Sequence, residues 1–419
     1  MTPLTPRFAK EKRTAGGVRL CVRSQSVIFE IIYSYMRAKR LRNLIFSIHR
    51  YIGLVVGLIL ILIGITGSLL VFHSDIDDWI VSQQFGVVIP QGQPISIDRT
   101  VEIAQAAHPQ WKAVSVSIPK SDRHPFHVVM EEPNANPDIY LDGAHQVFVN
   151  PYTEKVMGDR LERFSYYRFL LNLHYRLFVE QPGVILTGTV ALFLLIAAVT
   201  GTFLWSGWRK LSTGFKIKWK AHIKRRNFDL HKVVGITTAV FLSLTAITGF
   251  GWNFSDFTYP AIRTVTFSPI PNDDPVTSKP ISGQAPITLT QAVEQAKAAL
   301  PGMQLNSVDL PGSETGAISI YGLYGESWST YGVAHIDRYN GKVLQVEDSR
   351  QPKSLGDRII NSFFDLHVGT FWGLPSRFLY VLVGFAPLVL FITGVVMWQH
   401  RRENKNKSKS VKIPVTSDR

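Results

Sequence analysis

The chain has 419 residues, 46% of them apolar, and 45 lysine and arginine residues against 31 acidic ones, which gives a net charge of +14. Its single cysteine, Cys21, excludes a disulfide scaffold, a cysteine zinc site and a cysteine-ligated iron–sulfur cluster. Four stretches contain no Asp, Glu, Lys or Arg: residues 51–72, 181–208, 233–255 and 378–399. At about 1.5 Å per helical residue, each stretch can cross about 30 Å of hydrocarbon. The composition therefore excludes a wholly soluble enzyme and predicts an α-helical membrane protein.

The positive charge is concentrated on one side of the predicted membrane. Residues 208–228 hold eight basic residues and no acidic one, the tail after His400 has seven basic against two acidic residues, and the N-terminus is also basic. The positive-inside rule places these segments in the cytoplasm. Residues 74–170 and 256–366 carry a small acidic excess and are expected in the periplasm. Topology and contact with anionic membrane lipid account for the charge, so no nucleic acid is expected as a partner.

In chain order, the sequence predicts a multi-pass protein of the bacterial inner membrane with both termini in the cytoplasm. The basic N-terminus lacks a signal-peptide cleavage site, so the first membrane helix is expected to be an uncleaved anchor. The expected segments are an N-terminal arm (1–43), helix 1 (44–73), an extracytoplasmic domain (74–170), an interfacial segment with helix 2 (171–207), a basic loop (208–227), helix 3 (228–254), a second extracytoplasmic domain (255–365), an interfacial segment with helix 4 (366–400) and a basic tail (401–419).

An internal duplication runs through these segments. Residues 49–53 with 65–67 match residues 231–235 with 247–249 at an offset of 182; residues 95–109 match 287–301 at 192; and residues 173–174 with 199–201 match 366–367 with 392–394 at 193. The pattern predicts two parallel repeats, each made of a helix, an extracytoplasmic domain and a helix, related by an axis along the membrane normal. An amphipathic helix followed by alternating apolar segments predicts an α+β module in each domain, with the helix on an antiparallel sheet.

Several of these motifs together resemble the PepSY-associated transmembrane family, which includes iron-regulated inner-membrane proteins and ferric-siderophore reductases. The resemblance covers Leu44 to Arg402, and its marks are 49–53, 173–174, 230–231 and 366–369, the Thr-Gly pairs, and the module endings at 150–153 and 337–341. It implies two PepSY-like domains, b-type haem, and outward electron transfer that reduces the iron of a ferric siderophore in the periplasm. Because no fused reductase segment is found in these residues, the resemblance leaves a quinol or a separate cytoplasmic reductase as the electron donor.

Four histidines are the predicted haem ligands. His49 and His231 begin helices 1 and 3 at the cytoplasmic side, and His174 and His367 precede helices 2 and 4 at the outer side. The members of each pair are repeat mates and are expected to meet across the pseudo-two-fold axis. A haem iron binds axial ligands on both faces of a flat ring, which suits such an axis. We therefore expect an inner haem on the first pair and an outer haem on the second.

The Thr-Gly pairs place a glycine near each predicted ligand. Gly67 and Gly249 are expected near the outer pair, and Gly201 and Gly394 near the inner pair, where glycine leaves room for a macrocycle. The alternative is plain packing of small residues between helices.

His73 has no histidine at its repeat-equivalent position, which is Ser255. It either replaces His174 or His367 as an axial ligand or lines the approach of the substrate.

Two functions from different classes compete on these observations. The first is a transmembrane haem oxidoreductase acting as a ferric-siderophore reductase. The alternative is a non-enzymatic PepSY-type regulator or assembly protein that binds peptides or a protease. A transporter is disfavoured because none of the four spans has an ionisable residue at its middle. No phosphate-binding, hydrolase or metalloprotease motif is found in the sequence, so no catalytic side chain is assigned.

Overall fold

The computed structural model describes residues 16–136, 139–271, 274–325, 327, 329–352 and 354–410, with side chains described between 39 and 404. Four of its helices are long and apolar enough to span a membrane, over Lys39–Leu70, Glu180–Trp208, Ile223–Asn253 and Leu374–Asn404. They belong to α1 (Gly16–Leu70), α5 (Glu180–Leu204), α7 (Ile223–Asn253) and α11 (Leu374–Ser410). The prediction of a four-helix membrane protein is confirmed. Helix α1 begins at Gly16, so most of the predicted N-terminal arm continues the first membrane helix.

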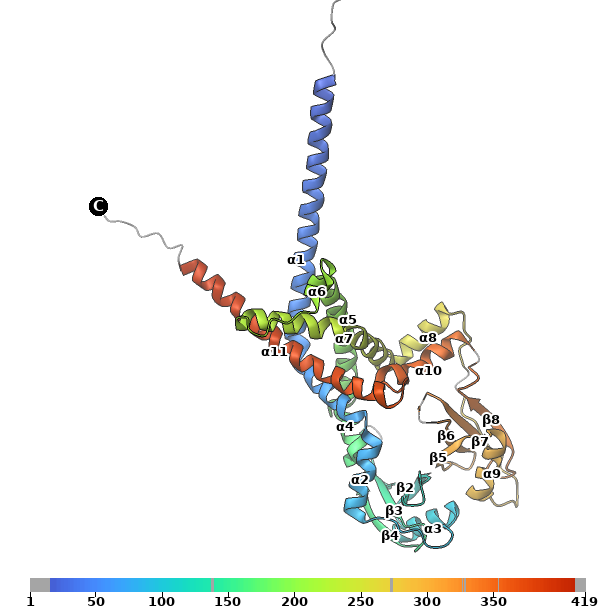
Figure 1. The fold of residues 1–419 in the computed structure, drawn as a ribbon. Coiled ribbons are helices and arrows are strands. Elements are labelled where there is room, and N and C mark those ends of the chain that lie inside the picture. The colour runs from blue at the N-terminus through green and yellow to red at the C-terminus, as the bar shows by residue number, and fades with distance from the viewer. Residues whose placement is uncertain are drawn as a thin grey trace, which may run out of the picture.

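The four long helices form one group in which α1 and α7 each pack against both α5 and α11 (Figure 1). Their apolar side chains face outward, as Val55, Leu58 and Val240 show, each at least 65% exposed. A membrane stabilises such a surface, whereas water does not. Between α1 and α11 the backbones approach closely, because a Cβ on Gly64 would lie 2.3 Å from the carbonyl oxygen of Gly384. Small residues permit this contact between membrane helices.

An antiparallel sheet lies at one end of the helix group, which we call the sheet side; the opposite end is the far side. The eight strands are β1 (Lys112–Ser117), β2 (Phe126–Glu131), β3 (Ala144–Val149), β4 (Val156–Leu161), β5 (Gln304–Asp309), β6 (Ile318–Leu323), β7 (Tyr331–Ile336) and β8 (Val343–Asp348). Their order is β4-β3-β2-β1-β5-β6-β7-β8. The expected helix-on-sheet modules are present, but β1 pairs with β5, so the two four-stranded parts form one continuous sheet.

Two helices cover one face of this sheet, α3 (Ile97–Ala107) and α9 (Leu289–Ala299). Their alanines pack on alternate strand residues such as Val116, Val128 and Val308, none of which is exposed. The period of two in a strand sends the residues between them to the opposite face, toward the membrane helices. A side-chain contact also links the helices, since Asp98 of α3 accepts hydrogen bonds from the first amides of α9.

Short helices connect the sheet to the membrane helices. On the sheet side these are α2 (His73–Phe85), α4 (Tyr166–Tyr175), α8 (Ser255–Val265) and α10 (Leu355–Val368), with η1 (Glu162–Phe164) before α4. On the far side, η2 (Ser206–Trp208) and α6 (Leu211–Gly214) lie between α5 and α7. Helices α4 and α10 carry His174 and His367, so these two histidines lie on separate short helices ahead of the spans.

Candidate functional site

The four predicted ligand histidines lie in two facing pairs. His49 and His231 form the far-side pair, with ring centroids 6.1 Å apart and ring planes at 89°. His174 and His367 form the sheet-side pair, with centroids also 6.1 Å apart and planes at 87°. The sequence predicted both pairings, and the structure places the same four residues in two sites of nearly identical geometry.

A threonine from a neighbouring helix fixes one nitrogen of each ring. The Nδ1 atoms of His49, His174, His231 and His367 lie 3.2, 3.0, 2.8 and 2.8 Å from the hydroxyl oxygens of Thr200, Thr66, Thr393 and Thr248, respectively. Each threonine belongs to a Thr-Gly pair and comes from the helix that does not carry its histidine. On the far side, α5 supplies the threonine for His49 of α1, and α11 supplies it for His231 of α7. On the sheet side, α1 supplies the threonine for His174 of α4, and α7 supplies it for His367 of α10.

These contacts determine which nitrogen carries the hydrogen. Each of the four threonine hydroxyls donates to the carbonyl oxygen four residues earlier in its own helix, at 2.6–2.8 Å. With its hydrogen on that carbonyl, the threonine oxygen accepts a hydrogen bond, and on this basis we assign the donor hydrogen to Nδ1. The Nδ1 of His49 also lies 3.0 Å from the carbonyl oxygen of Ala197, which can only accept. The hydrogen therefore resides on Nδ1, and Nε2 keeps the lone pair with which a neutral imidazole binds a metal.

Glycines accommodate the rings beside these threonines. A Cβ built on Gly67 would lie 3.0 Å from Cε1 of His174, and one on Gly201 would lie 2.9 Å from Cε1 of His49. A Cβ on Gly249 would lie 3.2 Å from Cε1 of His367. The fourth position is looser, because a Cβ on Gly394 would lie 3.7 Å from Cε1 of His231. Each glycine thus lies at the histidine pair to which the sequence assigned it. The sequence analysis expected these glycines to leave room for the haem macrocycle, but in the structure each one lies against an imidazole ring.

The sheet-side pair is deeply buried. Desolvation by burial lowers the pKa of His174 to about 4. The same effect, with a smaller electrostatic contribution from His174, lowers the pKa of His367 to about 3. Both imidazoles are therefore neutral at pH 7, the form that a metal ligand requires. Trp252 of α7 packs on His367, with ring centroids 4.9 Å apart.

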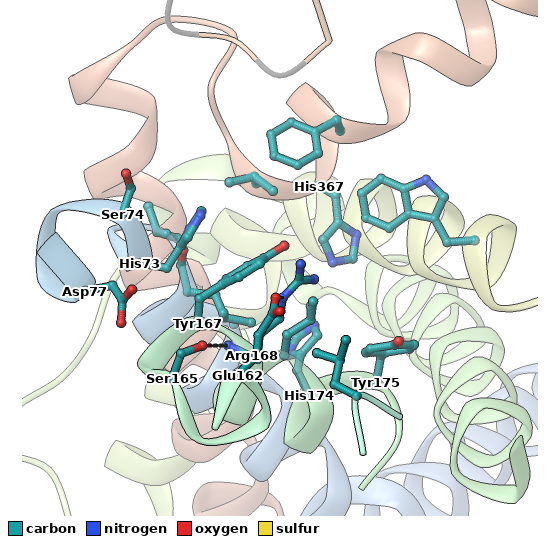
Figure 2. Close-up of a pocket in the computed structure, with 18 of the residues that line it drawn as sticks. His73, Ser74, Asp77, Glu162, Ser165, Tyr167, Arg168, His174, Tyr175 and His367 are labelled. Carbon is teal, nitrogen blue, oxygen red and sulfur yellow. Dashed lines mark hydrogen bonds and ion pairs between the residues drawn. The ribbon is translucent and has the colours of Figure 1, made fainter. Parts of the chain in front are cut away.

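His73 does not join either pair. Its Nδ1 lies 2.8 Å from the carbonyl oxygen of Leu70, and its ring stacks on Tyr167 with centroids 4.3 Å apart. It lines the same cavity as the sheet-side pair, on the side of α2 (Figure 2). Of the two roles considered for His73, this position favours lining the approach to the pair.

A cavity of about 1170 Å³ extends from the sheet-side pair to the sheet. Its membrane section is apolar and lies between the helices around His174 and His367, with Ile63, Leu194 and Leu242 among the lining residues. Its polar section lies between α2, α4 and the face of the sheet that α3 and α9 leave free; Figure 2 shows Asp77, Glu162 and Arg168 there. The cavity is larger than the roughly 300–1,000 Å³ of ordinary small-molecule sites.

Ion pairs fix most charges of the polar section. Arg160 binds Asp77 at 2.6 Å, Lys120 binds Asp78 at 2.7 Å, and Arg168 binds the buried Glu162 at 2.9 Å. His127, which points into this section from β2, is neutral because burial lowers its pKa to about 4.

The donor set suits a metal held between two imidazoles. With a metal–nitrogen bond of about 2 Å and a ring nitrogen about 1 Å from its ring centre, an ion held linearly between two imidazoles separates their centroids by about 6 Å. Both pairs have this separation. Within the part of the chain that is described, no group of three or more His, Cys, Asp or Glu side chains is placed to hold a metal. The pairs thus offer two protein ligands each, the number that a bis-histidine haem needs.

Four apolar helices and an antiparallel sheet at one end define a membrane protein with a separate α+β domain. The family model described as the PepSY-associated TM region matches residues 46–401, and the chain belongs to this family. An uncharacterised protein of Pseudomonas aeruginosa strain PAO1 is 26% identical over 258 residues, which cover 56% of this chain and 63% of that protein. A crystal structure described as a candidate lipoprotein from Clostridium difficile 630 is 11% identical and has a TM-score of 0.25, over 61% of this chain and 95% of that one.

The sequence reasoning missed the threonines as hydrogen-bond acceptors and Trp252 as a wall of the sheet-side pair. The signal for the threonines was present, because each of the four glycines follows a threonine: Thr66, Thr200, Thr248 and Thr393. Four repetitions of a dipeptide beside four histidines indicate a paired role. Trp252 had no such signal, since its position resembles that of an aromatic anchor at the membrane surface.

Proposed function

We propose that this chain is a haem-containing oxidoreductase of the bacterial inner membrane that moves electrons from the cytoplasmic side to ferric siderophore iron in the periplasm. The far side then faces the cytoplasm, as its basic loops require, and the sheet lies in the periplasm. The two copies of the helix, domain and helix unit are parallel repeats, and the two histidine pairs lie between them. A quinol or a cytoplasmic reductase supplies the electrons.

The observation that carries the proposal is the fourfold unit of histidine, threonine and glycine, arranged as two facing pairs. A ring distance of 6.1 Å alone falls within the roughly 4.5–7 Å of ordinary aromatic contacts. What ordinary packing does not require is the same tautomer at four sites, with Nε2 left to bind a metal. His49 and His231 would hold one haem b, and His174 and His367 the other; a haem with two imidazole ligands supplies a one-electron redox centre.

The residues of the chain have separate tasks in this function. The threonines orient the imidazoles and accept their Nδ1 hydrogens, which raises the basicity of Nε2. The apolar helices exclude water from both pairs. The cavity joins the sheet-side pair to the polar face of the sheet, so a bulky chelate can approach without entering the hydrocarbon.

A spectroscopic experiment tests this function. The purified protein, once reduced chemically and freed of excess reductant, should show low-spin b-type bands. Adding a ferric siderophore with an Fe(II) trap should then oxidise the haem while Fe(II) appears. His367→Ala should abolish this reaction, whereas His335→Ala, on β7 away from the cavity, should not. A wild-type protein without haem bands would contradict the proposal. If His367→Ala reduced the siderophore at the normal rate, His73 would be the next candidate ligand. Normal reduction by a variant that lacks both His73 and His367 would contradict the proposed mechanism.

A further inference from the structure

The polar section of the cavity has an excess of negative charge. The side chains that line the cavity include five carboxylates, Asp77, Asp78, Glu131, Glu162 and Asp309, and two cations, Lys120 and Arg168. Lys120 and Arg168 each neutralise one carboxylate, and Arg160 neutralises Asp77 from just outside the lining. Glu131 and Asp309 form no ion pair with another described residue.

These two carboxylates lie on the same face of the sheet. Glu131 ends β2 and Asp309 ends β5, and strand alternation directs both away from the core beneath α3 and α9, since their neighbours Met130 and Val308 are buried there. Asp309 pairs across the sheet with Ser115 of β1, which also lines the cavity. One carboxylate comes from each module, so the pairing of β1 with β5 brings both to the cavity.

The surroundings of these carboxylates compensate their charge only in part. Lys112 of β1 is the cross-strand neighbour of Glu131 but forms no ion pair with it, and Asp309 accepts one hydrogen bond from Tyr321. Two of the three histidines that line this section do not supply cations at pH 7, because burial lowers the pKa of His127 to about 4 and also lowers the pKa of His73. The third, His124, lies 3.9 Å from Asp78 and not beside Glu131 or Asp309 in any described ion pair. Burial raises the pKa of Asp309, which means that its charged form is poorly solvated. A bound cation stabilises these negative charges and a neutral ligand adds no repulsion, whereas a bound anion increases the electrostatic repulsion.

We infer that the polar section selects ferric chelates by charge, admitting neutral and cationic complexes and rejecting polyanionic ones. This inference rests on the proposed function for its substrate and adds the class of siderophore. Iron(III) bound by three hydroxamates has no net charge, because three single negative charges balance the ion. Iron(III) bound by three catecholates carries three negative charges and meets like charge at Glu131 and Asp309. The hydroxamate type is therefore the substrate class.

A binding experiment with gallium tests the charge selection without any redox step. Gallium(III) replaces iron(III) in both complexes but is not reduced, so binding of a neutral gallium tris-hydroxamate and a trianionic gallium tris-catecholate can be measured by calorimetry on the full chain in nanodiscs. We expect the neutral complex to bind at least tenfold more tightly. The double variant Glu131→Gln/Asp309→Asn should reduce this preference at least fivefold by strengthening binding of the trianion.

A matched control removes two charges from the other face. Glu102→Gln/Glu294→Gln changes one exposed carboxylate on α3 and one on α9, and it should leave the preference unchanged. Equal binding of both complexes by the wild type, or an equal effect of the control variant, would overturn the inference. Charge-selective binding by a protein that lacks haem would instead contradict the proposed function and leave the inference standing.

Discussion

At each of the four ligand positions, one histidine contacts one threonine and one glycine. Within the far-side pair, the glycine beside His49 is closer to its ring than the glycine beside His231. A Cβ on Gly201 would lie 2.9 Å from Cε1 of His49, so the ring or the helix would have to shift, whereas one on Gly394 would lie 3.7 Å from Cε1 of His231. Gly201→Ala should therefore displace the ring of His49 and convert the inner haem to high spin or lose it. Gly394→Ala should keep it, and alanine is favoured over glycine in a helix by about 1 kcal/mol. Haem content and spin-state bands of the two variants provide the measurement, and equal loss in both would contradict it.

The threonine contact affects redox potential rather than binding alone. Thr393→Val removes the oxygen that lies 2.8 Å from Nδ1 of His231, so Nε2 becomes a weaker donor. A hydrogen bond of about 1 kcal/mol corresponds to roughly 40 mV for one electron, and the midpoint potential of the inner haem should rise by about that amount. Thr393→Ser restores the acceptor and should return the potential toward wild type. An unchanged potential in the valine variant would show that the contact has no electronic effect.

At the scale of elements, the turn between α4 and α5 positions His174. A Cβ on Gly183 would lie 1.6 Å from the carbonyl oxygen of Arg176, and Leu177, Phe178 and Glu180 adopt positive φ in this turn. Such strain persists only where the surrounding structure imposes it. Gly183→Ala should shift α4 and deplete the outer haem while leaving the inner one. Gly235→Ala, which meets only Leu390 at 3.7 Å, is the control. Retention of both haems in Gly183→Ala would show that α4 is not held by this turn.

The sequence predicted some elements and not others for physical reasons. The four spans follow from uninterrupted apolar stretches, and the histidine pairs from positions that repeat in both halves. The pairing of β1 with β5 was not predicted, because each would be an edge strand of a separate module and alternation does not reveal which edges meet. No contact between the threonines and the histidines was predicted, because a hydroxyl bonded to its own helix usually has no other partner. The start of α1 at Gly16 reflects a helix that continues beyond the apolar stretch.

For the whole molecule, the orientation in the membrane can be tested with one cysteine at a time. Cys21 lies in α1 beyond the far side of its span and is expected in the cytoplasm. A membrane-impermeant maleimide should label it only after cells are permeabilised. Asp122→Cys in a Cys21→Ser background introduces a thiol at an exposed turn between β1 and β2, and this should react in intact spheroplasts. The reverse pattern would place the sheet in the cytoplasm and contradict periplasmic chelate reduction.

The central claim is that the four histidines hold two haem groups, and counting haem per chain tests it most directly. Pyridine haemochrome analysis should give two haem b per wild-type chain, one in His49→Ala/His231→Ala, one in His174→Ala/His367→Ala, and none when all four are replaced. Folded yield is followed by size exclusion, so that a loss of haem is distinguished from a loss of protein. If the wild-type protein, produced with ample haem supply, contains none, or if the quadruple variant retains the wild-type content, the two-haem account is wrong.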